Sequence, residues 1–331
     1  MKHLNTIFIL GYPRSGTTWF ANVFNSHPDV VYRHKVIGRC YKYFPKEMFH
    51  RLKHDYGLAD DEYKKSINII LSPNVESDRA PFFPKNYLVF KNTRFHYISW
   101  IISRTLSIFE PLYRFIFFPR SEDVTLIIKE TRSTVNMDSL LTGLRADRIV
   151  VLLRHPCGAI ASSLTGIQTG KMHQSTASMR ENWFAENKDK SYIKELNLSI
   201  SEIRSLPEYE YLAILRKQQN DDYLAFTSTD YDKRFISYES FMADQENKVK
   251  ELFEKLSLNY DLMVEQFLNA ASGSGDSKPI LKDSSSKFYS VYRSQGFDPS
   301  RWQKSLLPEQ ISAIEKHSLD TFNRLLEFSN N

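Results

Sequence analysis

A short apolar segment, a glycine turn and an amphipathic segment together constrain this fold more than any other feature of the sequence. Residues 6–10 (TIFIL) are rich in β-formers and predict a buried strand, and residues 18–26 carry apolar side chains at helical spacing. Between them, residues 11–19 (GYPRSGTTW) include two glycines that let the main chain turn tightly. A strand, a glycine-containing loop and a helix in this order predict a phosphate-binding site, because loop amides and helix N-termini attract anions.

Two further apolar runs extend this pattern along the chain. Residues 124–128 (VTLII) and 149–153 (IVVLL) are continuously apolar, as is usual for strands buried on both faces of a parallel sheet. Helical patterns follow at 246–256 and 308–328. We therefore expect a three-layer α/β fold with a mainly parallel central sheet and a P-loop-like nucleotide-binding architecture.

The length and composition favour one domain. The chain has 331 residues, of which 41% are hydrophobic and 25% charged, enough apolar material for a large core. We expect a single domain over residues 1–331, with an acceptor-binding or lid segment at about 80–120 and a mobile loop at about 272–298. The apolar stretch 97–119 is interrupted by charges, so no transmembrane span is expected. Contact with a membrane surface, an apolar lid and a partly buried core helix all stay open for it.

The charge and cysteine content exclude several classes of partner. The net charge of +5 is modest and the basic residues are dispersed, so no nucleic-acid partner is expected. Cys40 and Cys157 form neither a disulfide framework nor a cysteine-rich metal pattern, which favours a cytoplasmic location without a bound metal. No signal peptide is expected before the first strand. The sequence does not indicate an oligomeric state.

The loop differs from that of ATP- and GTP-binding proteins in the position of its cation. Those loops place a lysine directly after the second glycine, where it reaches the terminal phosphates. Here Thr17 follows Gly16, and the cation is Arg14, inside the loop. A nucleotide without a γ-phosphate, bound without an obligatory metal, explains this change. A nucleotide kinase or other phosphotransferase is the alternative enzyme, and a silent nucleotide-binding or membrane-associated protein is the non-enzymatic alternative.

The loop and two downstream segments resemble the sulfotransferases that use 3′-phosphoadenosine-5′-phosphosulfate (PAPS). Residues 13–19 (PRSGTTW) look like the 5′-phosphosulfate loop of this family, in the style of its bacterial, carbohydrate and tyrosylprotein members. Arg154 and Ser162, spaced R-x-P-x-x-x-x-x-S, resemble its 3′-phosphate motif. Tyr238 is similar to a residue beside the adenine, and Arg293 and Arg301 compete for the place of a second cation at the 3′-phosphate.

The resemblance implies an enzyme that moves a sulfuryl group from PAPS to a hydroxyl or amine of an acceptor. The displacement would be in line, would need a general base and no metal, and would leave 3′,5′-adenosine bisphosphate (PAP). The nucleotide-binding residues that it implies are Pro13, Arg14, Ser15, Gly16, Thr17, Thr18, Trp19, Arg154, Ser162, Tyr238, Arg293 and Arg301.

Four residues are candidates for the chemistry. Arg14 is placed by its loop to neutralise charge on the leaving phosphate. Lys129, at the end of the strand 124–128, resembles the family's catalytic lysine in its separation from the 3′-phosphate motif. Glu130 is the first choice of base, and His34 the second, since an imidazole titrates near neutral pH. Lys35 stands where some members of the family have a glutamate, and the run 33–35 (RHK) would also suit an anionic acceptor.

The acceptor is the least defined part of the prediction. We expect a small molecule or a glycan. An apolar part is one hypothesis, because aromatic residues are 14% of the chain and many lie at 80–120. Core packing explains the same residues without a ligand. Peripheral contact with a membrane is a further partner that this segment would allow.

Overall fold

The computed structural model describes residues 4–54, 58–121, 123–131, 137–227, 229–272, 290–292 and 298–329. Backbone contacts divide the chain into two compact units. Unit 1 comprises Met1–Leu152, Asp230–Ile236 and Ser240–Phe297, and unit 2 comprises Leu153–Thr229, Ser237–Glu239 and Asp298–Asn331. The expected single domain stays a prediction, and the predicted mobile loop at 272–298 lies almost entirely outside the described residues.

A five-stranded sheet with the order β2-β3-β1-β4-β5 forms the centre of unit 1. Its strands are β1 (Thr6–Gly11), β2 (Val30–His34), β3 (Thr125–Lys129), β4 (Arg148–Leu153) and β5 (Asp232–Ser237). Strand β1 pairs in parallel with β3 and β4, and β2 pairs in parallel with β3. The predicted strands and the mainly parallel sheet are confirmed, whereas β2 and β5 were not expected from the sequence.

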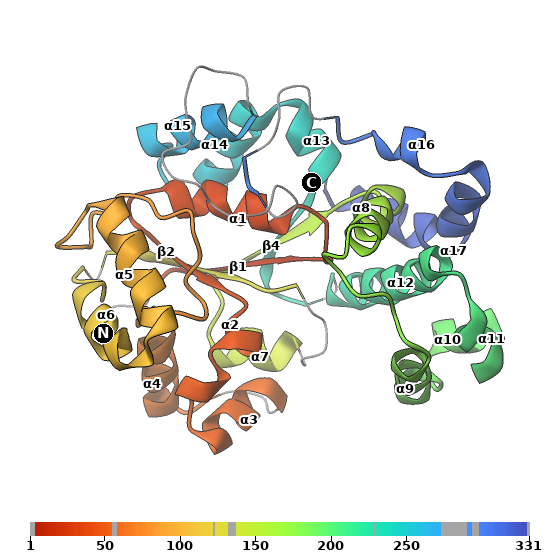
Figure 1. Ribbon diagram of the computed structural model, residues 1–331, viewed down its shortest axis with the longest axis horizontal. Helices are drawn as coiled ribbons and strands as arrows, with labels where there is room; N and C mark the ends of the chain where they lie inside the picture. Colours follow the sequence, from red (N-terminus) through yellow and green to blue (C-terminus); the bar gives the residue numbers. More distant parts are fainter. Residues whose placement is uncertain are drawn as a thin grey trace. The chain divides into compact units, whose positions relative to one another are not determined.

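Helices cover both faces of this sheet and complete the three layers (Figure 1). One face carries α1 (Thr17–Ser26), α14 (Gln245–Lys255) and α15 (Leu262–Ser272). The other face carries α2 (Val36–Arg39), α4 (Asp60–Leu71) and α7 (Met137–Gly143), and α3 (Lys46–His54) packs on α7. The short elements η1 (Tyr41–Tyr43) and α13 (Tyr238–Ala243) follow α2 and β5 respectively.

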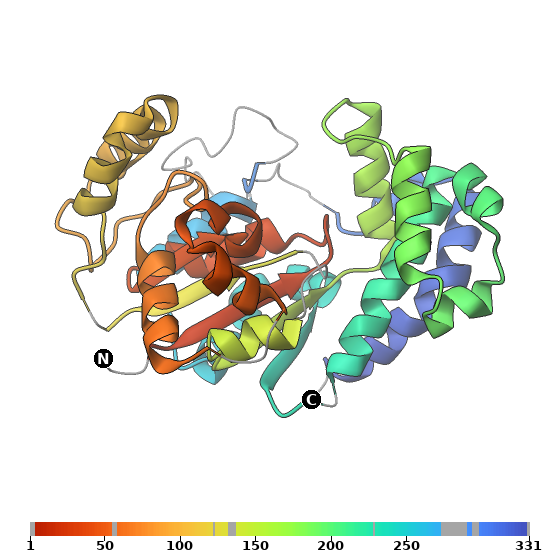
Figure 2. The same ribbon diagram turned by 90° about the horizontal axis from the view of Figure 1, so that it is seen from below.

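Beyond β2, the chain forms a helical hairpin within the predicted lid segment (Figure 2). Helices α5 (Thr93–Thr105) and α6 (Glu110–Ile116) pack together and are joined by the 3₁₀ turn η2 (Ser107–Phe109). The side chain of Asn92 caps α5 by accepting a hydrogen bond from Phe95 N at 3.0 Å. None of the helices in the described ranges is long and apolar enough to cross a membrane.

Unit 2 is helical. Helices α12 (Glu208–Phe226) and α17 (Pro308–Glu327) pack along each other, and α8 (Pro156–Gln168) and α16 (Trp302–Ser305) complete their core. A second core joins α9 (Ala177–Asn187), α10 (Ser191–Leu196) and α11 (Ile200–Ser205) to the N-terminal half of α12. The helices expected at 246–256 and 308–328 are therefore confirmed as α14 and α17.

Candidate functional site

The loop between β1 and α1 presents a helix N-terminus that no side chain caps. Gly16 is the N-cap residue with a φ of 87°, and Arg14 also has a left-handed backbone with a φ of 70°. The turn closes through a hydrogen bond from Ser15 N to Tyr12 O at 3.0 Å. The first amides of a helix have no partner within it, and α1 has no acidic residue in its first turn. This helix end can therefore attract an anion.

Gly11, the last residue of β1, lies close to both α1 and β4. A Cβ atom at this position would lie 2.5 Å from Cγ2 of Thr17 and 2.9 Å from the carbonyl oxygen of Leu152. These distances are too short for any side chain, so the tight return of the loop over β1 requires glycine. A tight glycine turn between a strand and a helix is typical of phosphate-binding loops.

The predicted loop residues differ in their exposure. Pro13 and Thr18 are exposed, Arg14 and Gly16 are half-buried, and Ser15 and Thr17 are buried. Trp19 is also buried, with its ring 5.9 Å from that of Phe241 in an edge-to-face contact. The indole of Trp19 thus packs in the core of unit 1.

Lys129 extends from the end of β3 to the first turn of α1. Its ammonium donates a hydrogen bond to Thr18 Oγ1 at 3.2 Å, and the residue is only 1% exposed. Burial, with a further contribution from Lys35, lowers its pKa to about 7. A buried ammonium with a depressed pKa gains strongly from a nearby anion, because the anion favours its charged form.

Three further cations lie close enough to act on Lys129 at the carboxyl end of β3. Lys35, Arg39 and Arg14 each depress the pKa of Lys129. Lys35 directly follows β2, and its backbone amide donates to the carbonyl oxygen of Lys129 at 2.8 Å. Arg39 is contributed by α2 and donates to the carbonyl oxygen of Glu76 at 3.3 Å. Positive charge is thus concentrated near an anion-attracting helix end. The sequence did not point to Arg39.

The two candidate bases, Glu130 and His34, face opposite sides of the sheet. A carboxylate oxygen of Glu130 accepts a hydrogen bond of 2.9 Å from the amide of Ile37 in α2. His34 pairs with Lys129 in the β2–β3 register, and paired residues of adjacent strands point to the same face. Lys129 contacts α1 through Thr18, and α1 and α2 lie on opposite faces (Figure 1). His34 therefore shares the face of the ammonium, and Glu130 does not.

Burial affects the protonation of both candidate bases. The pKa of His34 lies well below its ordinary value, first because the side chain is buried and second because of the charge of Lys129. The imidazole is therefore neutral at pH 7. Nδ1 of His34 lies 2.9 Å from the hydroxyl of Tyr32. If Nδ1 donates in this contact, Nε2 is the acceptor. Burial also raises the pKa of Glu130 to about 7, although the hydrogen bond from Ile37 acts in the opposite direction and lowers this pKa.

The basic run 33–35 does not act as one cluster. Arg33 points away from His34 and caps the end of α4, donating from Nε to the carbonyl oxygen of Ile70 at 2.6 Å. It also forms a buried ion pair with Asp78 at 2.8 Å. The interpretation of 33–35 as a joint anion-attracting group is therefore corrected, because strand alternation sends neighbouring side chains to opposite faces.

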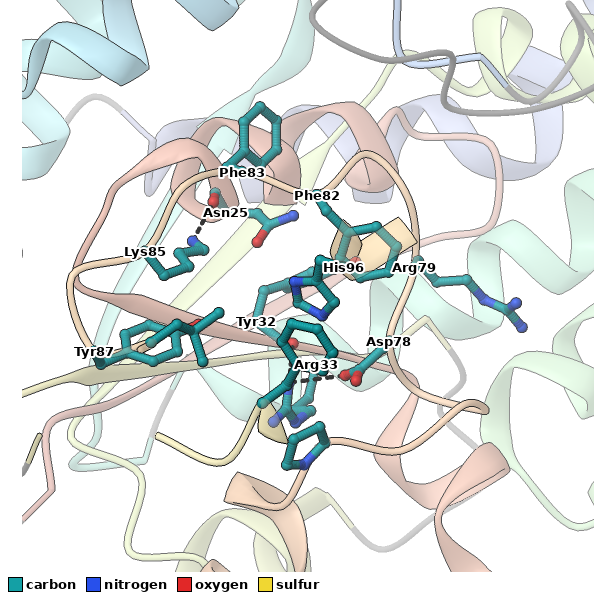
Figure 3. Close-up of a pocket in the computed structure, with 13 residues that line it drawn as sticks. Asn25, Tyr32, Arg33, Asp78, Arg79, Phe82, Phe83, Lys85, Tyr87 and His96 are labelled. Atoms are coloured by element: carbon teal, nitrogen blue, oxygen red, sulfur yellow. Dashed lines mark hydrogen bonds and ion pairs between the residues drawn. The ribbon is translucent and has the colours of Figure 1, made fainter. Parts of the chain in front are cut away.

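A cavity of about 40 Å³ lies beside this ion pair (Figure 3). Arg33, Asp78, Phe82, Lys85 and His96 are among the residues that line it. Burial lowers the pKa of Lys85 to about 7 and that of His96 to about 3. The space suits water molecules, whereas acceptor pockets typically measure about 300–1,000 Å³. The apolar acceptor pocket expected at 80–120 stays a prediction.

In unit 2, Arg154 follows β4 and lies over the ring of Tyr238. The guanidinium carbon is 4.8 Å from the ring centroid, and both residues are buried. Burial lowers the pKa of Arg154. The neighbours Tyr238 and Glu239 counteract this lowering, and the charge of Arg301 lowers the pKa of Arg154 further. The carboxylate of Glu239 also accepts a hydrogen bond from His155 N at 3.1 Å. Arg154 is thus held in place by aromatic and acidic neighbours.

The first turns of α8 leave room for this guanidinium. A Cβ on Gly158 would lie 3.1 Å from Nε of Arg154, so a larger residue would displace the arginine. Ser162 lies one turn further along the same helix face and is half-buried. The next hydroxyl, of Ser163, donates to the carbonyl oxygen of Ala159 at 3.1 Å.

Of the two C-terminal arginines predicted to bind the 3′-phosphate, the structure describes only Arg301. Arg301 is exposed, is the N-cap residue of α16 and influences the pKa of Arg154. Arg293 lies outside the described residues. Within the described ranges, no group of three or more His, Cys, Asp or Glu side chains could hold a metal ion.

Comparisons with known proteins point to one family. A family model described as "Sulfotransferase family" matches residues 6–261. Mouse sulfotransferase SULT7A1 complexed with PAP is 13% identical, with a TM-score of 0.48 and coverage of 98% of this chain and 89% of that one. A sulfotransferase from Alicyclobacillus acidocaldarius is 12% identical, with a TM-score of 0.44 and coverage of 100% and 97%. No protein of curated function matches the sequence.

Proposed function

The chain belongs to the sulfotransferase family, and from this we propose that it transfers a sulfuryl group from PAPS to a hydroxyl or amine of an acceptor. The observation that carries the proposal is the buried ammonium of Lys129, which contacts Thr18 at the uncapped N-terminus of α1. The absence of a lysine after Gly16 supports a donor without a γ-phosphate. The family match does not favour a kinase or a silent nucleotide-binding protein.

The residues of unit 1 have separate roles in the proposed reaction. The amides at the start of α1, with Thr17 and Thr18, bind the 5′-phosphosulfate. The acceptor oxygen or nitrogen forms a bond to sulfur while the bond from sulfur to the 5′-phosphate oxygen breaks. Arg14 and Lys129 stabilise the charge that grows on the leaving phosphate and the transferring group. PAP is released, and the proton of the acceptor passes to a base.

We propose His34 as that base. It lies on the same face of the sheet as Lys129 and is neutral at pH 7, as a proton acceptor must be. Glu130 instead accepts the Ile37 amide on the other face, which supports a positioning role for it at the start of α2. Glu130 is the alternative base, because the resemblance implies it and because its pKa, raised by burial to about 7, lies near the operating pH.

A donor comparison tests the function itself. The chain should transfer labelled sulfate from PAPS to some member of a panel of alcohols, phenols, amines, sugars and lipids, without added metal. Phosphoryl transfer from ATP with magnesium, and none from PAPS, would contradict the proposal. A small-molecule or glycan acceptor and a cytoplasmic location stay predictions.

Arg154 and Ser162 are proposed to bind the 3′-phosphate, with Arg301 as the second cation. A charge-assisted hydrogen bond contributes about 1.5–3 kcal/mol, so Arg154→Ala should weaken PAP binding by about 10- to 150-fold. Its affinity for AMP, which has no 3′-phosphate, should stay unchanged. Calorimetric titration of both nucleotides measures the two effects, and an equal loss for AMP would show that the arginine does not recognise the 3′-phosphate.

The pH dependence of kcat/KM separates the two bases. Lys129 must be protonated to stabilise charge, and its pKa is lowered to about 7, so activity should fall as pH rises through about 7. The low pKa of His34 predicts no rising limb near 7, whereas Glu130, with a pKa raised to about 7, would produce one. Initial rates between about pH 5 and 9 decide this. Lys129→Arg should lose the alkaline limb, because arginine stays charged.

A further inference from the structure

The outer side of the α5–α6 hairpin carries a dense group of exposed apolar side chains. Of the 17 large hydrophobic side chains exposed in the described part of the chain, 11 lie between residues 89 and 115. Six of them define what we call the outer apolar face: Ile98, Ile101, Ile102, Ile108, Leu112 and Phe115. Scattered apolar residues are normal on a protein surface, but a contiguous group marks an interaction surface.

The opposite side of the hairpin is fixed to the rest of unit 1. The indole of Trp100 donates to the carbonyl oxygen of Val75 at 3.2 Å, and the hydroxyl of Tyr113 donates to Asp78 at 2.7 Å. The rings of His96 and Phe117 stack with centroids 4.0 Å apart. Because the inner side already attaches the hairpin to unit 1, the side chains of the outer apolar face are not needed for this attachment.

Basic side chains accompany the outer apolar face. Residues 89–120 include one acidic residue, Glu110, whose carboxylate accepts a hydrogen bond from the hydroxyl of Tyr43. The basic residues of this segment are Lys91, Arg94, Arg104, Arg114 and Arg120, of which Arg114 turns inward and donates to Ser72 Oγ at 3.0 Å. The guanidinium carbon of Arg120 lies 5.3 Å from the ring centroid of Phe115 in the outer apolar face, whereas Arg104 lies over Trp100 on the inner side. Long basic side chains that lie along apolar surface can reach an anionic layer above it.

We propose that the hairpin docks on the surface of an anionic lipid bilayer. The outer apolar face would enter the boundary between headgroups and acyl chains, and the exposed basic side chains would contact the headgroup phosphates. An apolar face with basic residues and few acidic ones is the pattern that such a surface binds. A second copy of the chain fits less well, because docking two such faces together would oppose like charges.

Vesicle co-sedimentation tests the proposal on the full chain. The protein should bind vesicles of phosphatidylglycerol and phosphatidylcholine, and bind pure phosphatidylcholine much more weakly. Ile108→Asp with Phe115→Asp should weaken binding at least about tenfold, because two apolar side chains leave the bilayer. The matched control is Leu262→Asp on α15, where the side chain is 64% exposed and binding should not change.

A second pair of variants tests the charge. Arg94→Glu with Arg120→Glu should weaken binding to the anionic vesicles by at least about 25-fold, about fivefold for each arginine removed. Lys248→Glu with Lys255→Glu on α14 changes the net charge equally and should have a much smaller effect. PAP titration and thermal melting confirm that the variants fold.

Three results would overturn the proposal. The first is the absence of binding to anionic vesicles. The second is binding that the hairpin variants leave unchanged. The third is a dimer in sedimentation velocity that becomes a monomer with Ile108→Asp and Phe115→Asp while vesicles stay unbound, which would assign the face to a second copy. None of these readouts depends on sulfuryl transfer, so they stand apart from the proposed reaction.

Discussion

His34→Gln is expected to lower kcat for sulfuryl transfer by about 10²- to 10⁴-fold, the range found when a general base is removed. The side chain keeps a hydrogen-bonding group beside Tyr32 but cannot accept a proton at neutral pH. The affinity for PAP should change little, because the proposed role concerns the acceptor's proton. Single-turnover rates with saturating PAPS measure the first quantity, and calorimetry measures the second.

Glu130→Gln is the matched comparison for His34→Gln. The amide oxygen of glutamine still accepts the hydrogen bond from Ile37, so kcat should fall by less than about tenfold. If Glu130→Gln abolishes transfer while His34→Gln remains active, the assignment of the base is reversed. If both variants remain fully active, neither residue takes the proton.

Lys129→Met is expected to lower kcat by about 10³-fold, as is typical when a preorganised donor to a developing negative charge is removed. Lys129→Arg restores the charge but not the geometry, and should recover only part of the activity. Rates with PAPS at a fixed acceptor concentration provide the measurement. Retention of wild-type kcat in the methionine variant would exclude a role for the ammonium in the reaction.

Thermal stability separates this effect from misfolding. Because burial lowers the pKa of Lys129 to about 7, the folded state disfavours its charge. The cost to stability is therefore fully present below pH 7, and it decreases as pH rises toward the unfolded pKa of about 10.4. Lys129→Met removes this cost, so the variant should be as stable as the wild type or more stable, most clearly at low pH. An inactive but stable variant would identify a functional loss.

Three of the five strands could be predicted from the sequence, and two could not. Strands β1, β3 and β4 are continuous apolar runs, which is what burial on both faces of a parallel sheet requires. Strand β2 ends in Arg33 and His34, whose burial depends on partners far along the chain such as Asp78. Strand β5 (DKRFIS) lies at the edge of the sheet, where charged side chains are tolerated and obscure the pattern.

The same limit applies to the candidate site. The positions of Arg14 and Lys129 follow from local order, because each stands at the end of a strand or inside the loop after it. The proximity of Arg39 to Lys129 depends on where β2 and α2 lie in the fold. The contact of Arg154 with Tyr238 joins residues far apart in the chain. Spacing in sequence identifies local groups, and only tertiary structure identifies these pairs.

Strand β2 also constrains how this chain can change in length. Arg33 serves the structure through Asp78 and the end of α4, while His34 lies on the proposed reaction side. Gaining or losing one residue at 27–29 would exchange the faces of these two side chains and leave Asp78 without its partner. Selection for folding and selection for activity therefore act on the same turn. We expect homologues to vary the length of surface loops freely and to keep the length of this one.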